Sequence, residues 1–146
     1  MQNTIVREIT IKASKESIYK AITDPELIIS WFPDKVEGKL EVGERPILDF
    51  GVHGKNQIYV ESARPYTYFA YRWIPGSSHF LGDVLTKPNT LVEFYIEESE
   101  GKSRVTVKES GFASLPAEIA EQCFNDNSGG WEYMIGRLEK VMKNDK

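Results

Sequence analysis

The chain has 146 residues, a formal net charge of -4, and a composition that is 40% hydrophobic and 12% aromatic. This length and apolar content fit one domain with a sizeable core, covering residues 1–146. The negative charge and the lack of any long basic run argue against a nucleic-acid partner. Cys123 is the only cysteine, which excludes an internal disulfide and a multi-cysteine zinc site. We therefore expect a reducing, cytoplasmic location.

The N-terminal part predicts a strand followed by two short helices. Its first residues alternate between apolar and polar, as in a strand with one buried face, and contain no continuous apolar run typical of a signal peptide or membrane span. Ser14 precedes the helical pattern "KESIYKAI" and is its predicted cap. Asp24 and Pro25 have the residue types of a cap and a first helical position, so a second helix is predicted there.

The middle of the chain predicts antiparallel strands. Six β-rich runs lie between Val36 and Ser110, namely "VEGKLEV", "PILDFGV", "NQIYVESA", "YTYFAYRW", "TLVEFYIEE" and "KSRVTVKES". The last two are joined by Ser-Glu-Gly, which is typical of a hairpin at Glu98–Lys102. The break Pro75–Asn89 is longer than a hairpin needs and contains apolar residues. We predict that it is mobile or covers the mouth of a cavity.

The C-terminal segment predicts one long amphipathic helix beginning near Pro116. Its inward row steps by three or four residues through Ile119, Cys123, Asn127, Gly130, Met134, Leu138 and Val141, with a second row through Trp131, Ile135 and Met142. This register crosses Gly129 and Gly130 unbroken, so we expect a single helix of about 25 to 28 residues. The glycines are interpreted as a place of close approach to the sheet or of a slight bend.

The order of elements predicts an α+β fold in which a curved antiparallel sheet of about six to seven strands wraps around the C-terminal helix. Such a sheet leaves space where the helix is thin, so we expect a cavity beside the two glycines. Strand alternation and helical register provide its candidate lining residues. These are Trp31, Phe50, Phe69, Tyr71, Trp73, Phe94, Glu109, Asn127, Gly130, Trp131 and Met134.

Two polar residues of this set are predicted to face inward. Glu109 continues the alternating row of Val105 and Val107, and Asn127 lies on the inner row of the helix. Burying such groups is costly unless they are paired or meet a ligand. Internal hydrogen bonding and a ligand-orienting role both remain open. Core packing is likewise an alternative explanation for most of the aromatic residues.

The sequence predicts no catalytic residue, metal or cofactor. His53 and His79 have neither triad nor metal-ligand spacing, and both are expected on the surface or in loops. Cys123 lies on the inward helix row without a neighbouring histidine, which favours a buried, inert thiol.

Four stretches of the chain resemble bacterial single-domain homologues of the activator of the 90-kDa heat-shock-protein ATPase, within the SRPBCC (START-like, Bet v 1-like) superfamily. They are "REITIKASKESIYKAITDPELIISWF", "PYTYFAYRW", "TLVEFYIEE" with "VTVKESGF", and "GGWEYMIGRLEKVM". The resemblance implies the helix-grip fold. It leaves function open, because the superfamily includes lipid carriers, plant hormone and flavonoid binders, polyketide cyclases and co-chaperones.

Our leading interpretation is a non-enzymatic START-like domain that binds a small apolar, lipid-like or aromatic ligand between sheet and helix, with a role in a stress response as one setting. The eukaryotic activators also carry an N-terminal domain that grips the chaperone, for which 146 residues leave no room. A chaperone-linked interaction module with a weak protein partner is therefore the second interpretation. A cyclase- or hydrolase-type enzyme is the third. Membrane insertion is not expected, and the sequence does not indicate an oligomeric state.

Overall fold

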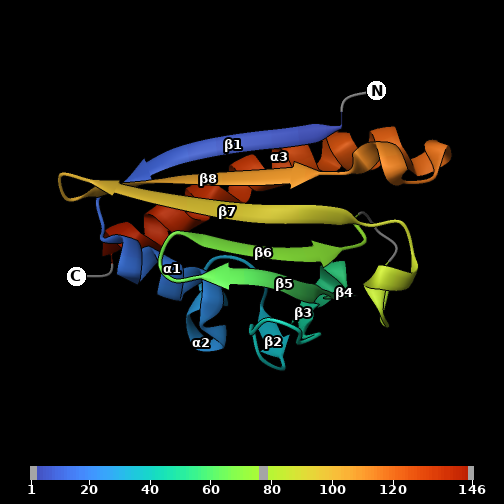
Figure 1. Cartoon of the computed structure of the whole chain (residues 1–146), viewed down its shortest axis with the longest axis horizontal. Helices are drawn as coiled ribbons and strands as arrows, with labels where there is room; N and C mark the ends of the chain where they lie inside the picture. The colour runs from blue at the N-terminus through green and yellow to red at the C-terminus, as the bar shows by residue number, and fades with distance from the viewer. Residues whose placement is uncertain (1–2, 76–78, 145–146) are drawn as a thin grey trace.

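The structure is a computed structural model that describes residues 3–75 and 79–144. Within these ranges, eight strands form two antiparallel sheets, and three α-helices accompany them (Figure 1). The elements are β1 (Thr4–Ile11), α1 (Lys15–Thr23), α2 (Pro25–Ile28), β2 (Lys35–Glu37), β3 (Ile47–Asp49), β4 (Lys55–Gln57), β5 (Tyr59–Arg64), β6 (Tyr68–Trp73), β7 (Thr90–Ser99), β8 (Lys102–Ser110) and α3 (Ala117–Asn144).

The two short helices begin as the sequence predicts. The Ser14 side chain accepts a hydrogen bond from the Ser17 backbone N–H at 3.1 Å, which caps α1. Asp24 does the same for α2 by accepting from the Glu26 N–H at 2.9 Å, and Pro25 is the first helical residue. Both caps are confirmed.

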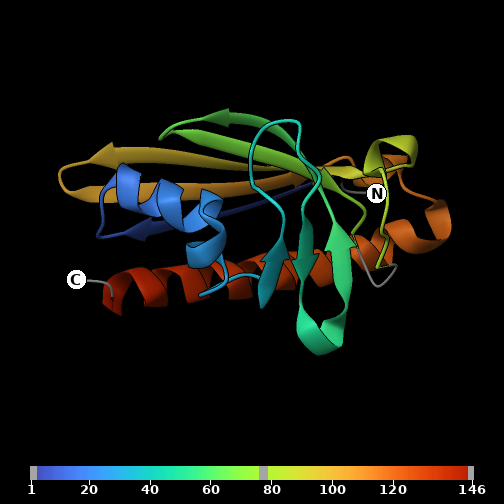
Figure 2. The ribbon, with the colours of Figure 1, turned by 90° about the horizontal axis from the view of Figure 1, so that it is seen from below.

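The large sheet has the strand order β1-β8-β7-β6-β5. Its longest hairpin, β7-β8, turns through Glu100 and Gly101, whose φ angles are 53° and 80°, and confirms the predicted hairpin. Alternation along β8 buries Val105, Val107 and Glu109 on the face that α3 covers. Figure 2 shows α3 running along this face, with α1 and α2 on the same side of the sheet. This is the helix-grip arrangement.

The prediction of one sheet of six to seven strands is wrong in one respect, because β2, β3 and β4 form a separate three-stranded sheet. The predicted run "NQIYVESA" is divided at Ile58. The backbone N–H of Ile58 bonds to the Pro46 carbonyl at 3.0 Å, and that of Gln57 bonds to the Phe80 carbonyl at 3.0 Å. The pairing of β4 with β3 therefore ends at Gln57, and β5 pairs instead with β6 in the large sheet.

The helix α3 is continuous over 28 residues, which confirms the predicted single helix. Its buried residues include Trp131, Ile135 and Met142, the second of the two predicted rows, whereas Ile119 of the first row is exposed. The predicted close approach at Gly129 and Gly130 is wrong. A Cβ atom added to either glycine would meet nothing within 4 Å among the described residues, because Gly130 lines an open pocket and Gly129 is exposed.

Candidate functional site: an aromatic pocket between the small sheet and α3

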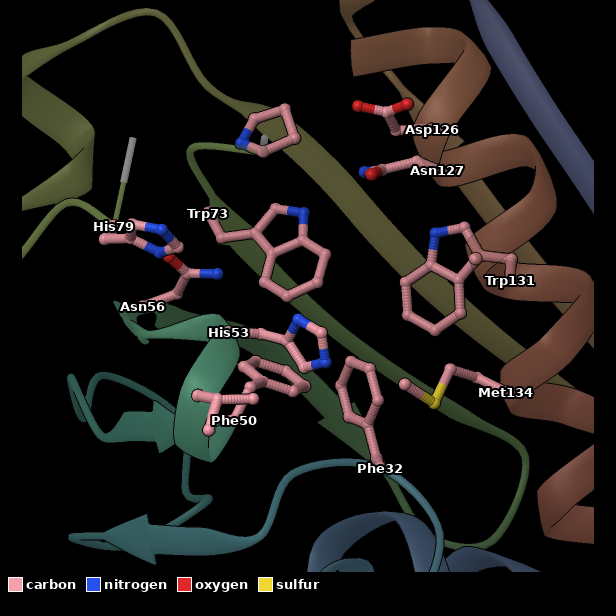
Figure 3. A pocket seen from close by; sticks show the side chains of 13 residues that line it. Phe32, Phe50, His53, Asn56, Trp73, His79, Asp126, Asn127, Trp131 and Met134 are labelled. Carbon is pink, nitrogen blue, oxygen red and sulfur yellow. The ribbon is translucent and has the colours of Figure 1, made fainter. Parts of the chain in front are cut away.

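A pocket of about 600 Å³ lies where the small sheet, β6 and α3 meet (Figure 3). The described residues that line it come from four distant parts of the chain. They are Phe32, Phe50, Val52, His53, Asn56, Trp73, Pro75, His79, Asp126, Asn127, Gly130, Trp131 and Met134.

Four aromatic rings form the apolar wall. The ring of Phe32 lies 5.3 Å from Phe50, 6.0 Å from Trp73 and 5.3 Å from Trp131, measured between centroids. The two indoles are 6.0 Å apart and tilted by 33°. In Figure 3 they lie side by side, and both ring nitrogens are directed toward the end of the pocket where Asn127 lies. These contacts make one continuous aromatic surface.

The two indoles are held in place by one buried carboxylate, that of Glu109 on β8. Its Oε2 atom accepts hydrogen bonds from Trp73 Nε1 at 2.9 Å and Thr90 Oγ1 at 2.6 Å. Its Oε1 atom accepts from Trp131 Nε1 at 2.8 Å and Asn127 Nδ2 at 2.9 Å. Four donors thus match the lone-pair positions of a carboxylate, which accepts only. Glu109 has 0% exposure, so these bonds supply the stabilisation that water would otherwise give.

The small sheet and its loops contribute the polar side of the pocket. His53 ends a short 3₁₀ helix, Gly51–His53, which begins where Asp49 Oδ1 accepts the Gly51 N–H at 2.8 Å. Gly54 follows with a φ of 98°, and a Cβ atom there would collide with the imidazole of His79. Only glycine allows this approach, so Gly54 lets both histidines reach the same pocket.

The segment Pro75–Asn89 borders the pocket through Pro75 and His79. Beyond His79 it is tied to β4, because Gly82 N–H donates to Gln57 Oε1 at 2.6 Å and Gln57 N–H donates to the Phe80 carbonyl. Its residues 76–78 lie outside the described part of the chain. That the segment is mobile or covers the pocket stays a prediction.

Comparison with protein families identifies the chain. A family model described as "Activator of Hsp90 ATPase homolog 1-like protein" matches residues 12–143. The chain belongs to this family. A comparison with proteins of curated function found no match.

Solved structures of low sequence identity share the fold. DynU16, a protein of the dynemicin biosynthetic locus, has a TM-score of 0.80 and 22% identity, covering 100% of this chain and 49% of DynU16. MLL2253 from Mesorhizobium loti has a TM-score of 0.79 and 22% identity over 98% of each chain. Aha1 from Colwellia psychrerythraea, solved as a dimer, has a TM-score of 0.77 and 20% identity over 99% of each chain. The chain thus spans about half the length of DynU16, and these likenesses show the fold alone.

The structure brings six of the eleven predicted lining residues to the pocket. They are Phe50, Trp73, Asn127, Gly130, Trp131 and Met134. Glu109 does not line it and instead lies behind the indoles as their hydrogen-bond acceptor. Asn127 lines the pocket and donates a hydrogen bond to Glu109, so its amide is paired internally, while a ligand-orienting role for it stays a prediction.

The other four predicted residues are buried elsewhere in the core, namely Trp31, Phe69, Tyr71 and Phe94. Trp31 stacks on Phe32 at 5.2 Å and donates its indole N–H to the Ala21 carbonyl at 2.8 Å, so it lies beneath the pocket wall. Phe94 packs edge-on against both Trp31 and Trp131, at 6.2 and 5.8 Å. Alternation therefore predicted the correct face of the sheet, but side chains from the α1–α2 region and α3 fill most of that face.

Seven of the residues that line the pocket were not among the predicted lining residues, and both histidines belong to these seven. His53 and His79 are loop residues, as expected, yet both line the pocket. Asp126 could have been found, because it lies one turn before Gly130 on the same helix. Phe32 is adjacent to the predicted Trp31. Pro75 and His79 belong to the segment Pro75–Asn89, which the sequence had already linked to the cavity mouth, whereas Val52 and Asn56 carried no signal that separated them from other loop and strand residues.

Burial shifts the pKa of two titratable groups near the pocket. Burial, with smaller effects of Asp126 and Glu109, raises the pKa of the Cys123 thiol, in agreement with an inert cysteine. Burial, followed by the nearby Glu109, raises the pKa of Tyr71 well above its ordinary value. Within the described ranges, no group of three or more His, Cys, Asp or Glu residues is placed to hold a metal ion. Nor does any helix there have the length and apolar character needed to cross a membrane.

Proposed function

We propose that residues 1–146 form one START-like domain that binds a small, largely apolar ligand carrying an aromatic ring. The observation that carries this proposal is the pocket of about 600 Å³, whose wall consists of four aromatic rings joined by four ring contacts, with a few polar groups around them. This volume and this composition are usual for small-molecule sites.

The wall is organised before any ligand arrives, which supports binding as its role. Glu109 fixes both indoles by hydrogen bonds, and the contacts of Phe32 fix the two phenyl rings against them. A ligand therefore does not have to order these side chains, and the entropic cost of binding is reduced.

Nuclear magnetic resonance of the indole N–H groups tests the proposal directly. We expect 2-naphthol, a neutral aromatic probe, to shift the Nε1–H signals of Trp73 and Trp131. The signal of Trp31 is an internal control, because its N–H donates to the Ala21 carbonyl and its ring does not line the pocket. Equal shifts of all three signals, or none, would contradict binding in this pocket.

A matched pair of variants locates the binding site. Gly130→Leu places a side chain into the pocket without a clash at Cβ, whereas Gly136→Leu makes the same change at an open position of α3 outside the lining. Both gain about 0.8 kcal/mol of helix propensity, so stability does not separate them. We expect Gly130→Leu to weaken naphthol binding about tenfold or more, and Gly136→Leu to leave it unchanged. Equal affinity in the two variants would exclude this pocket.

A further inference from the structure

The charges around the pocket are of one sign. Asp126 contributes its carboxylate to the lining, and Glu109 lies directly behind the two indoles. Among the described residues, no lysine or arginine lines the pocket. The formal net charge of the whole chain is also negative. An anionic ligand would lose hydration here without gaining a permanent opposite charge, which is costly.

The rings themselves favour a positive charge. Aromatic faces are negative because of the ring quadrupole, and Trp has the strongest such face. Two indoles and two phenyl rings form one wall of the pocket, with centroid distances of 5.3 to 6.0 Å among the four contacts that join them. Groups of aromatic side chains of this kind recognise ammonium groups in other proteins.

Glu109 strengthens this property. Each indole donates its only N–H to this carboxylate, at 2.9 Å for Trp73 and 2.8 Å for Trp131. A hydrogen bond to a negative acceptor polarises the donor, which moves electron density from the nitrogen into the ring. The faces that border the pocket thereby become more negative, while the carboxylate itself is screened from the ligand by the rings.

From these three observations we infer that the pocket selects aromatic ligands that carry a cationic ammonium group, with the ammonium placed against the aromatic wall and on the side of Asp126. The inference rests on the proposed function, since it names the chemical class of ligand for the same pocket. Asp126 is exposed and accepts a hydrogen bond from Gln122 Nε2 at 2.8 Å, so its carboxylate has a defined orientation at the rim.

Three naphthols that differ in one substituent test the inference on the wild-type protein. They carry at position 6 a trimethylammonium group, a tert-butyl group of the same shape, or a carboxylate. Titrations are followed by the indole signals of Trp73 and Trp131 at one fixed pH for all three compounds. We expect the ammonium compound to bind about 5- to 30-fold more tightly than the tert-butyl compound, and the carboxylate to bind most weakly.

Two charge-removing variants of α3 test the role of Asp126. Asp126→Asn should reduce the preference for ammonium over tert-butyl about two- to threefold. Glu132→Gln removes the same charge from an exposed position outside the lining and should leave the preference unchanged. An equal effect of both variants would show a general charge effect and overturn the assignment to Asp126.

The outcomes separate the inference from the proposed function. If the tert-butyl compound or the carboxylate binds as tightly as the ammonium compound, the cation preference is wrong and the aromatic pocket stands. If none of the three shifts the signals of Trp73 and Trp131, both the inference and the proposed function are wrong.

Discussion

Replacing Glu109 by glutamine should destabilise the protein more than its small change in shape suggests. The carboxylate accepts four hydrogen bonds, two of them from indole nitrogens that can only donate. A glutamine has one acceptor oxygen, and its NH₂ group must face the pair containing Trp73 or the pair containing Trp131. In either orientation one buried indole N–H loses its partner, at a cost of about 1 to 3 kcal/mol. Its remaining bonds become neutral and weaker, so we expect a total loss of about 3 kcal/mol.

Urea unfolding followed by circular dichroism measures this loss, with Glu93→Gln as the matched control. The Glu93 carboxylate also accepts two side-chain bonds on the large sheet, from the hydroxyls of Tyr68 at 2.5 Å and Tyr95 at 2.9 Å. These hydroxyls are only partly buried and rotate to meet water or an amide oxygen, so Glu93→Gln should cost under about 1 kcal/mol. If Glu109→Gln costs no more than Glu93→Gln, the indoles do not depend on the carboxylate.

Three further predictions concern single residues in and beside the pocket. Gly54→Ala should lower the free energy of unfolding by about 1 to 3 kcal/mol and displace the imidazole of His79, because φ is 98° and the new Cβ would collide with that ring. Thermal unfolding measures the first effect, and the histidine resonances measure the second. Tyr71→Phe should raise stability by up to about 1 kcal/mol at neutral pH, because within the described part of the chain the buried hydroxyl has no hydrogen-bond partner. Burial raises the pKa of Tyr71 in the folded state, so the free energy of unfolding of the wild type should fall as pH rises above about 10. The fall should be steeper than in Tyr71→Phe by up to about 1.4 kcal/mol per pH unit. Equal dependence of the unfolding free energy on pH in the two proteins would contradict this. Cys123 should react with iodoacetamide at about pH 8 at least roughly tenfold more slowly in the folded protein than in denaturant, because burial both shields the thiol and raises its pKa.

Local sequence patterns were sufficient to predict the helix starts, the long C-terminal helix and the buried face of β8. Ser14 and Asp24 have side chains that satisfy free N–H groups at helix starts, so their effect depends on a few neighbouring residues only. The register of α3 survived two glycines because a long apolar face, with Leu138 fully buried, outweighs their weak propensity. Alternation along β8 likewise placed Glu109 inside.

The pocket required information that no local pattern contains. Alternation tells which face of β6 a side chain occupies, so it treats Tyr71 and Trp73 alike, although only Trp73 reaches the pocket. The difference depends on how far the side chains of distant segments extend along that face. His53 and His79 line the same pocket because Gly54 leaves room for the imidazole of His79. Such contacts are set by tertiary packing alone.

The pairing of β1 with β8 places a constraint on how the chain folds during synthesis. Thr4 lies opposite Ser110, and Ile11 lies opposite Ser103, so β1 leaves the ribosome about a hundred residues before its partner strand exists. The pocket is completed still later, because Trp131 and Met134 follow β8 in the chain. Until α3 has been synthesised, the part of the inner sheet face that α3 covers (Figure 2) is exposed. The nascent chain therefore passes through a stage in which aromatic side chains of this face are accessible to chaperones or to aggregation, and in which the pocket is incomplete.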